Sequence, residues 1–164
     1  MENRSEFFEK FASQIKTKEQ LFFLLDEIEE AKRRVFKYKQ TTTLSDKLNE
    51  AVSGNFRRNI VELENQGVLT KNTSSQNSFL VALKKSLSGL PCLRLTLAFT
   101  PADEFIEKLS DCVEKTAGEK VILDIFVQGR IIGGVLFEYE GEYRDYSLAK
   151  KLDAVLEEDD FKHI

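Results

Sequence analysis

The sequence has few of the residues that build reactive or metal-binding sites. Its 164 residues include no tryptophan, a single histidine (His163) and two cysteines, Cys92 and Cys112. Two thiols and one imidazole cannot complete a closed zinc site, and one histidine near the end of the sequence is a poor base for a catalytic triad. We therefore expect no metal site, no cofactor and no enzymatic activity. We also expect free thiols, since one possible disulfide is too few for a disulfide-rich secreted scaffold.

The sequence also lacks a long hydrophobic run. Its longest stretch without a charged residue extends from Asn72 to Leu83, and half of that stretch is polar. A membrane-spanning helix needs about 20 apolar residues. The first residues include acids and are not followed by an apolar segment, so they do not resemble a signal peptide. We expect a cytoplasmic protein.

Charge is distributed unevenly along the sequence. The net charge is −4, but residues 1–90 carry a net charge of +3 and residues 91–164 a net charge of −7. The change near Pro91 indicates two units with different surroundings. Eight basic residues lie between Ala31 and Arg58. A solvated helix face explains them best, while a nucleic-acid-binding surface over residues 32–58 is the alternative.

The N-terminal part, residues 1–68, is predicted to be a small helical bundle. Apolar spacing predicts helices over 3–13, 17–38 and 45–66. The second helix carries apolar residues at alternating spacings of three and four, and further apolar residues widen that stripe beyond a simple coiled-coil seam. Most of this stripe should be bundle core. The surplus width suggests a surface for a partner helix, with the candidate residues Leu21, Phe22, Leu25, Ile28, Val35 and Phe36.

Residues 69–78 form a polar run that predicts a linker, and residues 79–164 predict a compact α/β unit. A short helix over 78–88 should lead into a strand over 93–99, in which apolar and polar residues alternate. Thr100 and Pro101 predict the start of a helix ending at Gly118. Residues 121–127 are apolar on both faces, which favours a central strand. A strand over 131–139, a hairpin at 140–141, a short strand and a last helix from Ser147 should follow. The predicted fold class is α+β.

An ordered set of residues in this second unit resembles a known family. The set comprises an isoleucine–glycine–glycine step, a hairpin glycine, and an aspartate–x–serine step into a helix with spaced leucines. It resembles the C-terminal part of the delta subunit of F-type ATP synthases, the oligomycin-sensitivity-conferring protein of mitochondria, over about residues 91–156. The residues that carry the resemblance are Ile132, Gly133, Gly134, Gly141, Asp145, Ser147, Leu148 and Leu152.

The resemblance implies a mechanical role rather than a chemical one. It implies a non-catalytic subunit of a proton-translocating ATP synthase. This subunit would link the alpha/beta catalytic head to the b subunits of the peripheral stalk and resist the torque of rotation. The implied partners are the N-terminal region of the alpha subunit and the b subunits. The implied location is the inner side of the cell membrane, without direct insertion.

Two other functions remain open at this point. Another peripheral-stalk protein, such as the E subunit of a V/A-type ATPase, belongs to the same functional class. A small nucleic-acid-binding protein would use the basic residues between Lys32 and Arg58. Steep salt dependence of binding to duplex DNA would distinguish the second of these from a stalk protein.

Overall fold

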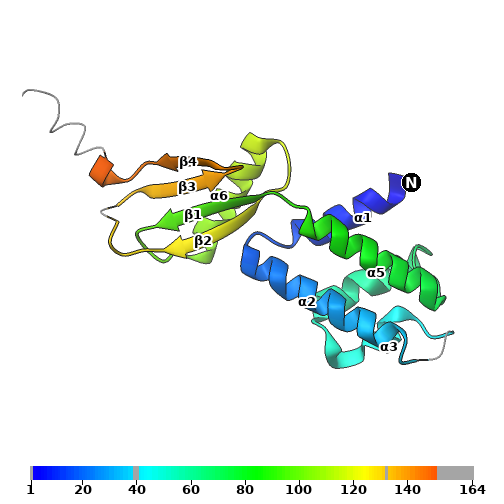
Figure 1. The fold of residues 1–164 in the computed structure, drawn as a ribbon. Coiled ribbons are helices and arrows are strands. Elements are labelled where there is room, and N and C mark those ends of the chain that lie inside the picture. The colour runs from blue at the N-terminus through cyan, green and yellow to red at the C-terminus, as the bar shows by residue number, and fades with distance from the viewer. Residues whose placement is uncertain (1, 39–40, 132, 151–164) are drawn as a thin grey trace, which may run out of the picture. The chain divides into compact units, whose positions relative to one another are not determined.

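The fold was analysed in a computed structural model, which describes residues 2–38, 41–131 and 133–150. Helices come first in the chain and a four-stranded mixed sheet follows, so the predicted α+β class is confirmed (Figure 1). The chain divides into two compact units. The helical unit contains residues 1–15 and 19–90, and the α/β unit contains residues 16–18 and 91–164.

The helical unit contains five α-helices and one short 3₁₀ helix. The first two α-helices match the segments that apolar spacing predicts. The elements are α1 (Glu2–Ser13), α2 (Lys18–Val35), α3 (Leu44–Leu48), η1 (Asn49–Ala51), α4 (Gly54–Asn65) and α5 (Thr73–Ser88).

The single helix predicted over 45–66 is broken into α3, η1 and α4. Asn49 has a positive φ of 41°, which ends α3. Ser53 then caps α4, because its hydroxyl accepts a hydrogen bond from the backbone N–H of Phe56 at 3.2 Å. Serine and asparagine compete for backbone hydrogen bonds and favour helix ends over helix interiors. The regular spacing of apolar residues continues across the break, so the sequence pattern gives no sign that the helix is interrupted.

The polar run 69–78 does not form the predicted linker. Asn72 caps α5 by accepting hydrogen bonds from the backbone N–H groups of Ser74 and Ser75, at 2.8 and 3.3 Å. The helix therefore begins at Thr73, and its polar first turns belong to the helical unit. The boundary between the units falls after Leu90 rather than within 69–78. This corrects the predicted boundaries of the helical part (1–68) and the α/β part (79–164), and it agrees with the change of charge near Pro91.

A fully buried lysine joins three helices of the helical unit. The Nζ of Lys47 donates hydrogen bonds to the last carbonyl of α2, at Val35 (3.1 Å), to Thr73 Oγ1 (3.2 Å) and to Gln76 Oε1 (2.8 Å). Burial lowers the pKa of the Lys47 ammonium. The position at the C-terminal end of a helix favours a cation, and the three acceptors compensate part of the desolvation. Lys47 thus ties the end of α2 to the beginning of α5.

We expect Lys47→Met to lower the free energy of unfolding by about 1–3 kcal/mol at neutral pH, because buried acceptors lose their donor. Urea denaturation of the variant measures this loss. The matched control is Lys37→Met at an exposed position after α2, which should leave stability unchanged. Equal stabilities of the two variants would contradict the role assigned to Lys47.

The lowered pKa of Lys47 also predicts a pH dependence. Just below the ordinary lysine pKa of 10.5, the unfolded chain holds this proton more tightly than the folded chain does. The stability difference between the unmodified protein and Lys47→Met should therefore grow as pH rises towards 10.5. Urea titrations of both proteins at several alkaline pH values check this sign.

The α/β unit is built on a sheet with the strand order β2-β1-β3-β4. Strands β1 (Cys92–Leu97) and β2 (Ile122–Val127) are parallel and are joined by α6 (Asp103–Ala117). Strands β3 (Val135–Tyr139) and β4 (Glu142–Asp145) form an antiparallel hairpin, and β3 also pairs with β1. The buried core comprises Leu93, Leu95, Val121 and Leu123. Helix α6 starts at Asp103, two residues after the proline predicted to open it.

Strand β2 lies at the edge of the four-stranded sheet, not at its centre as its apolar sequence predicted. The segment 16–18 covers its first half. Thr17 forms a parallel bridge with Leu123, and the N–H of Leu123 donates to the carbonyl of Lys16 at 2.9 Å. Ile122 and Leu123 are therefore fully buried, whereas Phe126 and Val127 further along are about half exposed. The apolar sequence of β2 is therefore explained by its coverage by residues 16–18, a contact between distant parts of the chain that the local sequence cannot reveal.

Candidate partner-docking surfaces

The structure separates the six candidate interface residues on and after α2 into two groups. Leu21, Ile28 and Val35 are buried in the core of the helical unit, with exposed fractions of 9%, 0% and 0%. These three cannot contact a partner while the unit is folded, which corrects the prediction for them. Phe22 and Phe36 are 55% and 65% exposed, and Leu25 is partly buried.

The second group lies on one stripe of the helix surface. Phe22, Leu25, Glu29 and Lys32 are spaced by three, four and three residues, which places them along one side of α2, and Phe36 follows four residues later in the turn directly after the helix. We call this set the outer stripe. Its apolar members lie at both ends, and the charged pair lies in the middle.

The charged middle of the outer stripe is fixed by ion pairs. Glu29 accepts from Lys32 at 3.0 Å and from Lys84 of α5 at 2.6 Å. The hydrogen bond from Lys84, followed by that from Lys32, lowers the pKa of Glu29. These contacts connect α2 to α5 across the helical unit. They hold the outer stripe in a defined orientation on the surface.

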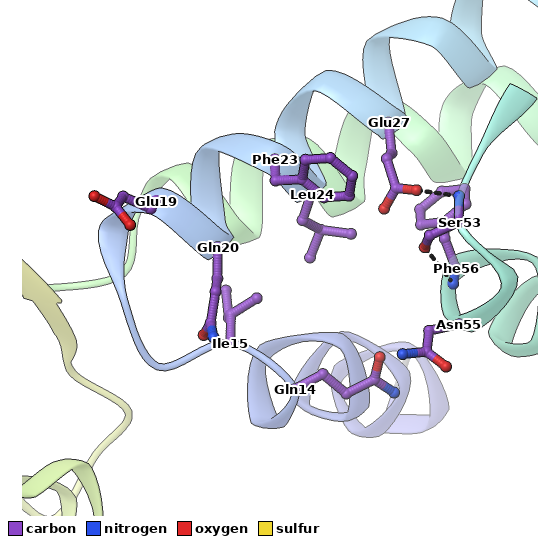
Figure 2. A pocket seen from close by; sticks show the side chains of 10 residues that line it. All are labelled: Gln14, Ile15, Glu19, Gln20, Phe23, Leu24, Glu27, Ser53, Asn55 and Phe56. Atoms are coloured by element: carbon purple, nitrogen blue, oxygen red, sulfur yellow. Dashed lines mark hydrogen bonds between the residues drawn. The ribbon is translucent and has the colours of Figure 1, made fainter. Parts of the chain in front are cut away.

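A hollow of about 450 Å³ lies in the helical unit on a side of α2 away from the outer stripe (Figure 2). It is bounded by the chain after α1, by one side of α2 and by the start of α4. Inside it, the carboxylate of Glu27 accepts from the N–H of Ser53, and Ser53 caps α4. The lining residues are Gln14, Ile15, Glu19, Gln20, Phe23, Leu24, Glu27, Ser53, Asn55 and Phe56. Phe23 is 64% exposed but belongs to this hollow, not to the outer stripe.

A second hollow lies between α1 and α4. It is lined by Phe7, Lys10, Glu62 and Val68, among others, and has a volume of about 630 Å³. Lys10 and Glu62 form an ion pair across it. Next to it, Gln14 and Asn59 exchange two amide hydrogen bonds, at 3.0 and 3.2 Å. This hollow is more polar than the first one and includes a charged pair that a ligand would have to displace or solvate.

Several of the basic residues between 31 and 58 are ion-paired or buried. Lys32 pairs with Glu29, while Arg33 and Arg34 pair with Glu30 at 3.3 and 2.7 Å. Lys47 is buried and bound to neutral acceptors. Ion pairing on one helix and burial of a lysine account for half of the eight basic residues. These observations favour the interpretation as a solvated helix face over a nucleic-acid surface.

In the α/β unit, five of the motif residues lie at the corner where β3 begins and β4 ends: Gly133, Gly134, Asp145, Ser147 and Leu148. Gly133 and Gly134 lie before β3 rather than inside a strand, with φ of +70° and +87°. The N–H of Leu148 donates to the carbonyl of Gly133 at 3.1 Å. Asp145 Oδ1 accepts from the N–H of Ser147 at 2.7 Å, and this backbone hydrogen bond lowers the pKa of Asp145.

Three further motif positions complete the comparison with the sequence prediction. Gly141 forms the predicted hairpin turn together with Glu140, both with positive φ, which is the backbone that favours two-residue hairpins. Ile132 and Leu152 lie outside the described residues. The described part of the motif therefore forms a corner and a hairpin turn, and of its glycines Gly134 is the one that a close backbone approach requires.

Gly134 is the position where this corner is most sensitive to substitution. A Cβ there would overlap the carbonyl oxygen of Tyr146 and lie 2.8 Å from Ser147 Cα. We expect Gly134→Ala to destabilise the α/β unit by about 1–3 kcal/mol more than Gly141→Ala. Gly141 has a similar φ of +82° but open space around it, so it controls for backbone strain alone.

Urea denaturation of both glycine variants, followed by far-UV circular dichroism, measures this difference. Equal destabilisation would show that the contact between residue 134 and the step at 146–147 contributes nothing beyond backbone strain.

The sheet face that carries Arg94 exposes aromatic and charged side chains together. Arg94 pairs with Glu138 at 3.2 Å and with Asp124 at 3.6 Å, and its guanidinium lies 5.5 Å from the centre of the Phe126 ring. Lys18 also binds Asp124, at 2.7 Å. Phe126 and Tyr143 on this face are 47% and 62% exposed. Sequence alternation marks these positions as outward-facing, but only the register brings them together.

No helix among residues 2–38, 41–131 and 133–150 is long and apolar enough to cross a membrane. Within the same ranges, no group of three or more His, Cys, Asp or Glu side chains is placed to hold a metal ion. Cys92 and Cys112 are both free and exposed.

Exposed aromatic and arginine side chains on both units are typical of a subunit within a protein assembly. Comparison with known families agrees with this class. The chain belongs to the ATP synthase delta (OSCP) subunit family, whose sequence model matches residues 2–158. It is accordingly a structural subunit of the peripheral stalk of an ATP synthase, a complex of ion transport and ATP synthesis.

Comparisons with individual proteins add little to the family match. The comparison with curated proteins gave no match. Among solved structures, a chain from a cryo-EM structure of the Polytomella F-ATP synthase in primary rotary state 3 is 22% identical. The match covers 40% of this chain and 84% of that chain, with a TM-score of 0.35. A score this low carries no structural argument, so the assignment rests on the family model.

Proposed function

We propose that this chain is the clamp that connects the alpha/beta head of a proton-translocating ATP synthase to its b subunits. It would act without catalysis, at the inner side of the membrane. Family membership supports a place for this chain in an ATP synthase. The division into two units supports a role in connecting two partners. Each unit offers its own exposed aromatic surface. A connector that resists rotation needs two such interfaces, because torque must pass from one partner to the other through it.

The outer stripe of the helical unit is proposed as the surface for the N-terminal region of the alpha subunit. Phe22 and Phe36, both more than half exposed, are large apolar anchors, one near the start of α2 and one in the turn directly after it. The ion-paired Glu29 and Lys32 between them provide a polar centre at fixed positions. Spaced apolar anchors are what an amphipathic partner helix needs. The exposure of Phe22 and Phe36 is the observation that carries this proposal.

The α/β unit is proposed to contact the b subunits through the sheet face that carries Arg94. Phe126 and Tyr143 give this face aromatic contact area, while Arg94 and Glu138 provide charge of both signs. A stalk helix with exposed charges would fit this surface of aromatic and charged side chains better than a surface made only of apolar side chains. Aromatic residues and arginine are enriched where protein interfaces form.

We expect the double variant Phe22→Ala/Phe36→Ala to weaken binding of an alpha-subunit N-terminal peptide at least tenfold. Truncating two exposed aromatic anchors removes contact area without opening a cavity in the bundle. Fluorescence anisotropy of the labelled peptide, titrated with each protein, measures the loss. Circular dichroism of each variant checks that the helical unit remains folded.

The chain supplies matched controls for this test. Phe23→Ala changes a similarly exposed phenylalanine of α2 that lines the first hollow, on another side of the helix, and Phe7→Ala tests the hollow between α1 and α4. Both should bind the peptide as the unmodified protein does. If Phe7→Ala or Phe23→Ala weakens binding while the double variant does not, the outer stripe is the wrong surface. If no form of the protein binds the peptide, the proposed link to the head is wrong.

A further inference from the structure

The first hollow of the helical unit is negatively charged. It has a volume of about 450 Å³ and lies between α2, the start of α4 and the chain after α1. Among the ten described residues that line it, Glu19 and Glu27 are acidic and none is basic (Figure 2). Residues 1–90 as a whole carry a net charge of +3, so the sign of the hollow differs from that of its surroundings.

Glu27 is the acidic side chain that points into the hollow (Figure 2). Only 9% of this residue is exposed, which is uncommon for a glutamate that has no basic partner among the described residues. Its Oε1 accepts from the N–H of Ser53, but no donor to its Oε2 is found in the described part of the chain. Every fully buried polar side-chain atom described has a partner, so this second oxygen is accessible from the hollow.

Capping of α4 explains only one of the two carboxylate oxygens of Glu27. A free backbone N–H and the helix dipole both favour a negative charge at the start of α4, beside Ser53. An ionised carboxylate can accept about four hydrogen bonds, and a largely buried one is costly when few are made. A cationic donor in the hollow would complete the contacts of Oε2.

Two neighbours of Glu27 define which cation fits. Phe23 is 64% exposed, lines the hollow and precedes Glu27 by four residues, on the same side of α2. Asn55, at the start of α4, adds a side-chain amide to the lining. The hollow thus combines a carboxylate oxygen, an amide oxygen and an aromatic face.

This combination favours a guanidinium over other cations. A guanidinium is planar, so it can lie flat on an aromatic ring while its N–H groups donate to oxygens at its edge. A lysine ammonium can pair with Glu27 but lacks the planar fork. A metal ion needs more oxygen ligands, and no group of three or more His, Cys, Asp or Glu side chains lies together within residues 2–38, 41–131 and 133–150.

We propose that this hollow binds an arginine side chain from a segment of a partner protein, with the guanidinium between the Glu27 carboxylate and the ring of Phe23. The hollow and the outer stripe lie on different sides of α2. One helix would therefore serve two partner segments, and the arginine site does not depend on the proposed clamp function.

NMR titration of the isotopically labelled full chain tests the site with two acetylated tripeptide amides, Ala-Arg-Ala and Ala-citrulline-Ala. Citrulline keeps the shape of arginine but is neutral. The arginine peptide should bind more tightly by about fivefold or more, because it alone forms a charged hydrogen bond. It should shift the backbone amide signals of Phe23, Glu27, Ser53 and Asn55.

Variants separate the site from general attraction between opposite charges. Glu27→Gln should weaken binding of the arginine peptide by about fivefold or more, while its amide oxygen can still accept from Ser53. Phe23→Leu, which keeps an apolar side chain without the ring, should also weaken it. The matched control is Asp26→Asn, which removes an exposed acid of the same helix outside the hollow and should leave binding unchanged.

Three results would overturn this assignment. Equal affinity of the unmodified chain for the arginine and citrulline peptides would do so without any variant. Equal losses in Glu27→Gln and Asp26→Asn would show general charge attraction. Displacement of the arginine peptide by the alpha-subunit peptide would overturn a separate partner segment, but would leave the clamp proposal intact. An alpha-subunit peptide that does not bind at all would contradict the clamp and not the arginine site.

Discussion

Burial of the inner face of α2 is the constraint on which the helical unit and its proposed interface depend. Ile28, Ala31 and Val35 are completely buried. This fixes the rotation of the helix, and the rotation in turn determines that Phe22 and Phe36 project outwards. The contacts of Lys47 with the end of α2 and of Lys84 with Glu29 hold the same helix against α5. The outer stripe is therefore a consequence of core packing.

Sequence periodicity predicted the elements that local pattern determines and failed where distant contacts decide. Helices α1, α2 and α6 and strands β1 and β4 follow from spacing of apolar residues and from turn glycines. The edge position of β2 could not be predicted, because the segment around Thr17, more than a hundred residues earlier, covers it. The early start of α5 depends on a single capping residue, Asn72, within a polar run that resembles a loop.

The candidate interface shows the same limit of sequence reasoning. The apolar residues of α2 form a stripe wider than one seam, and the pattern alone could not separate core from surface. Leu21, Ile28 and Val35 proved to be core, while Phe22 and Phe36 are exposed. The face around Arg94 was not predicted at all, because only strand register brings Phe126, Glu138 and Tyr143 to the same side. The glycine motif identified the family correctly, although its glycines form a corner and not a strand.

The central claim is that the chain holds two partners at once through two different units. Sedimentation velocity with the purified chain, an alpha-subunit N-terminal peptide and the soluble part of a b subunit tests this claim most directly. The account predicts one ternary complex that contains all three, with neither partner reducing binding of the other. Competition between the two partners, or binding of only one of them, would contradict a connector between head and stalk.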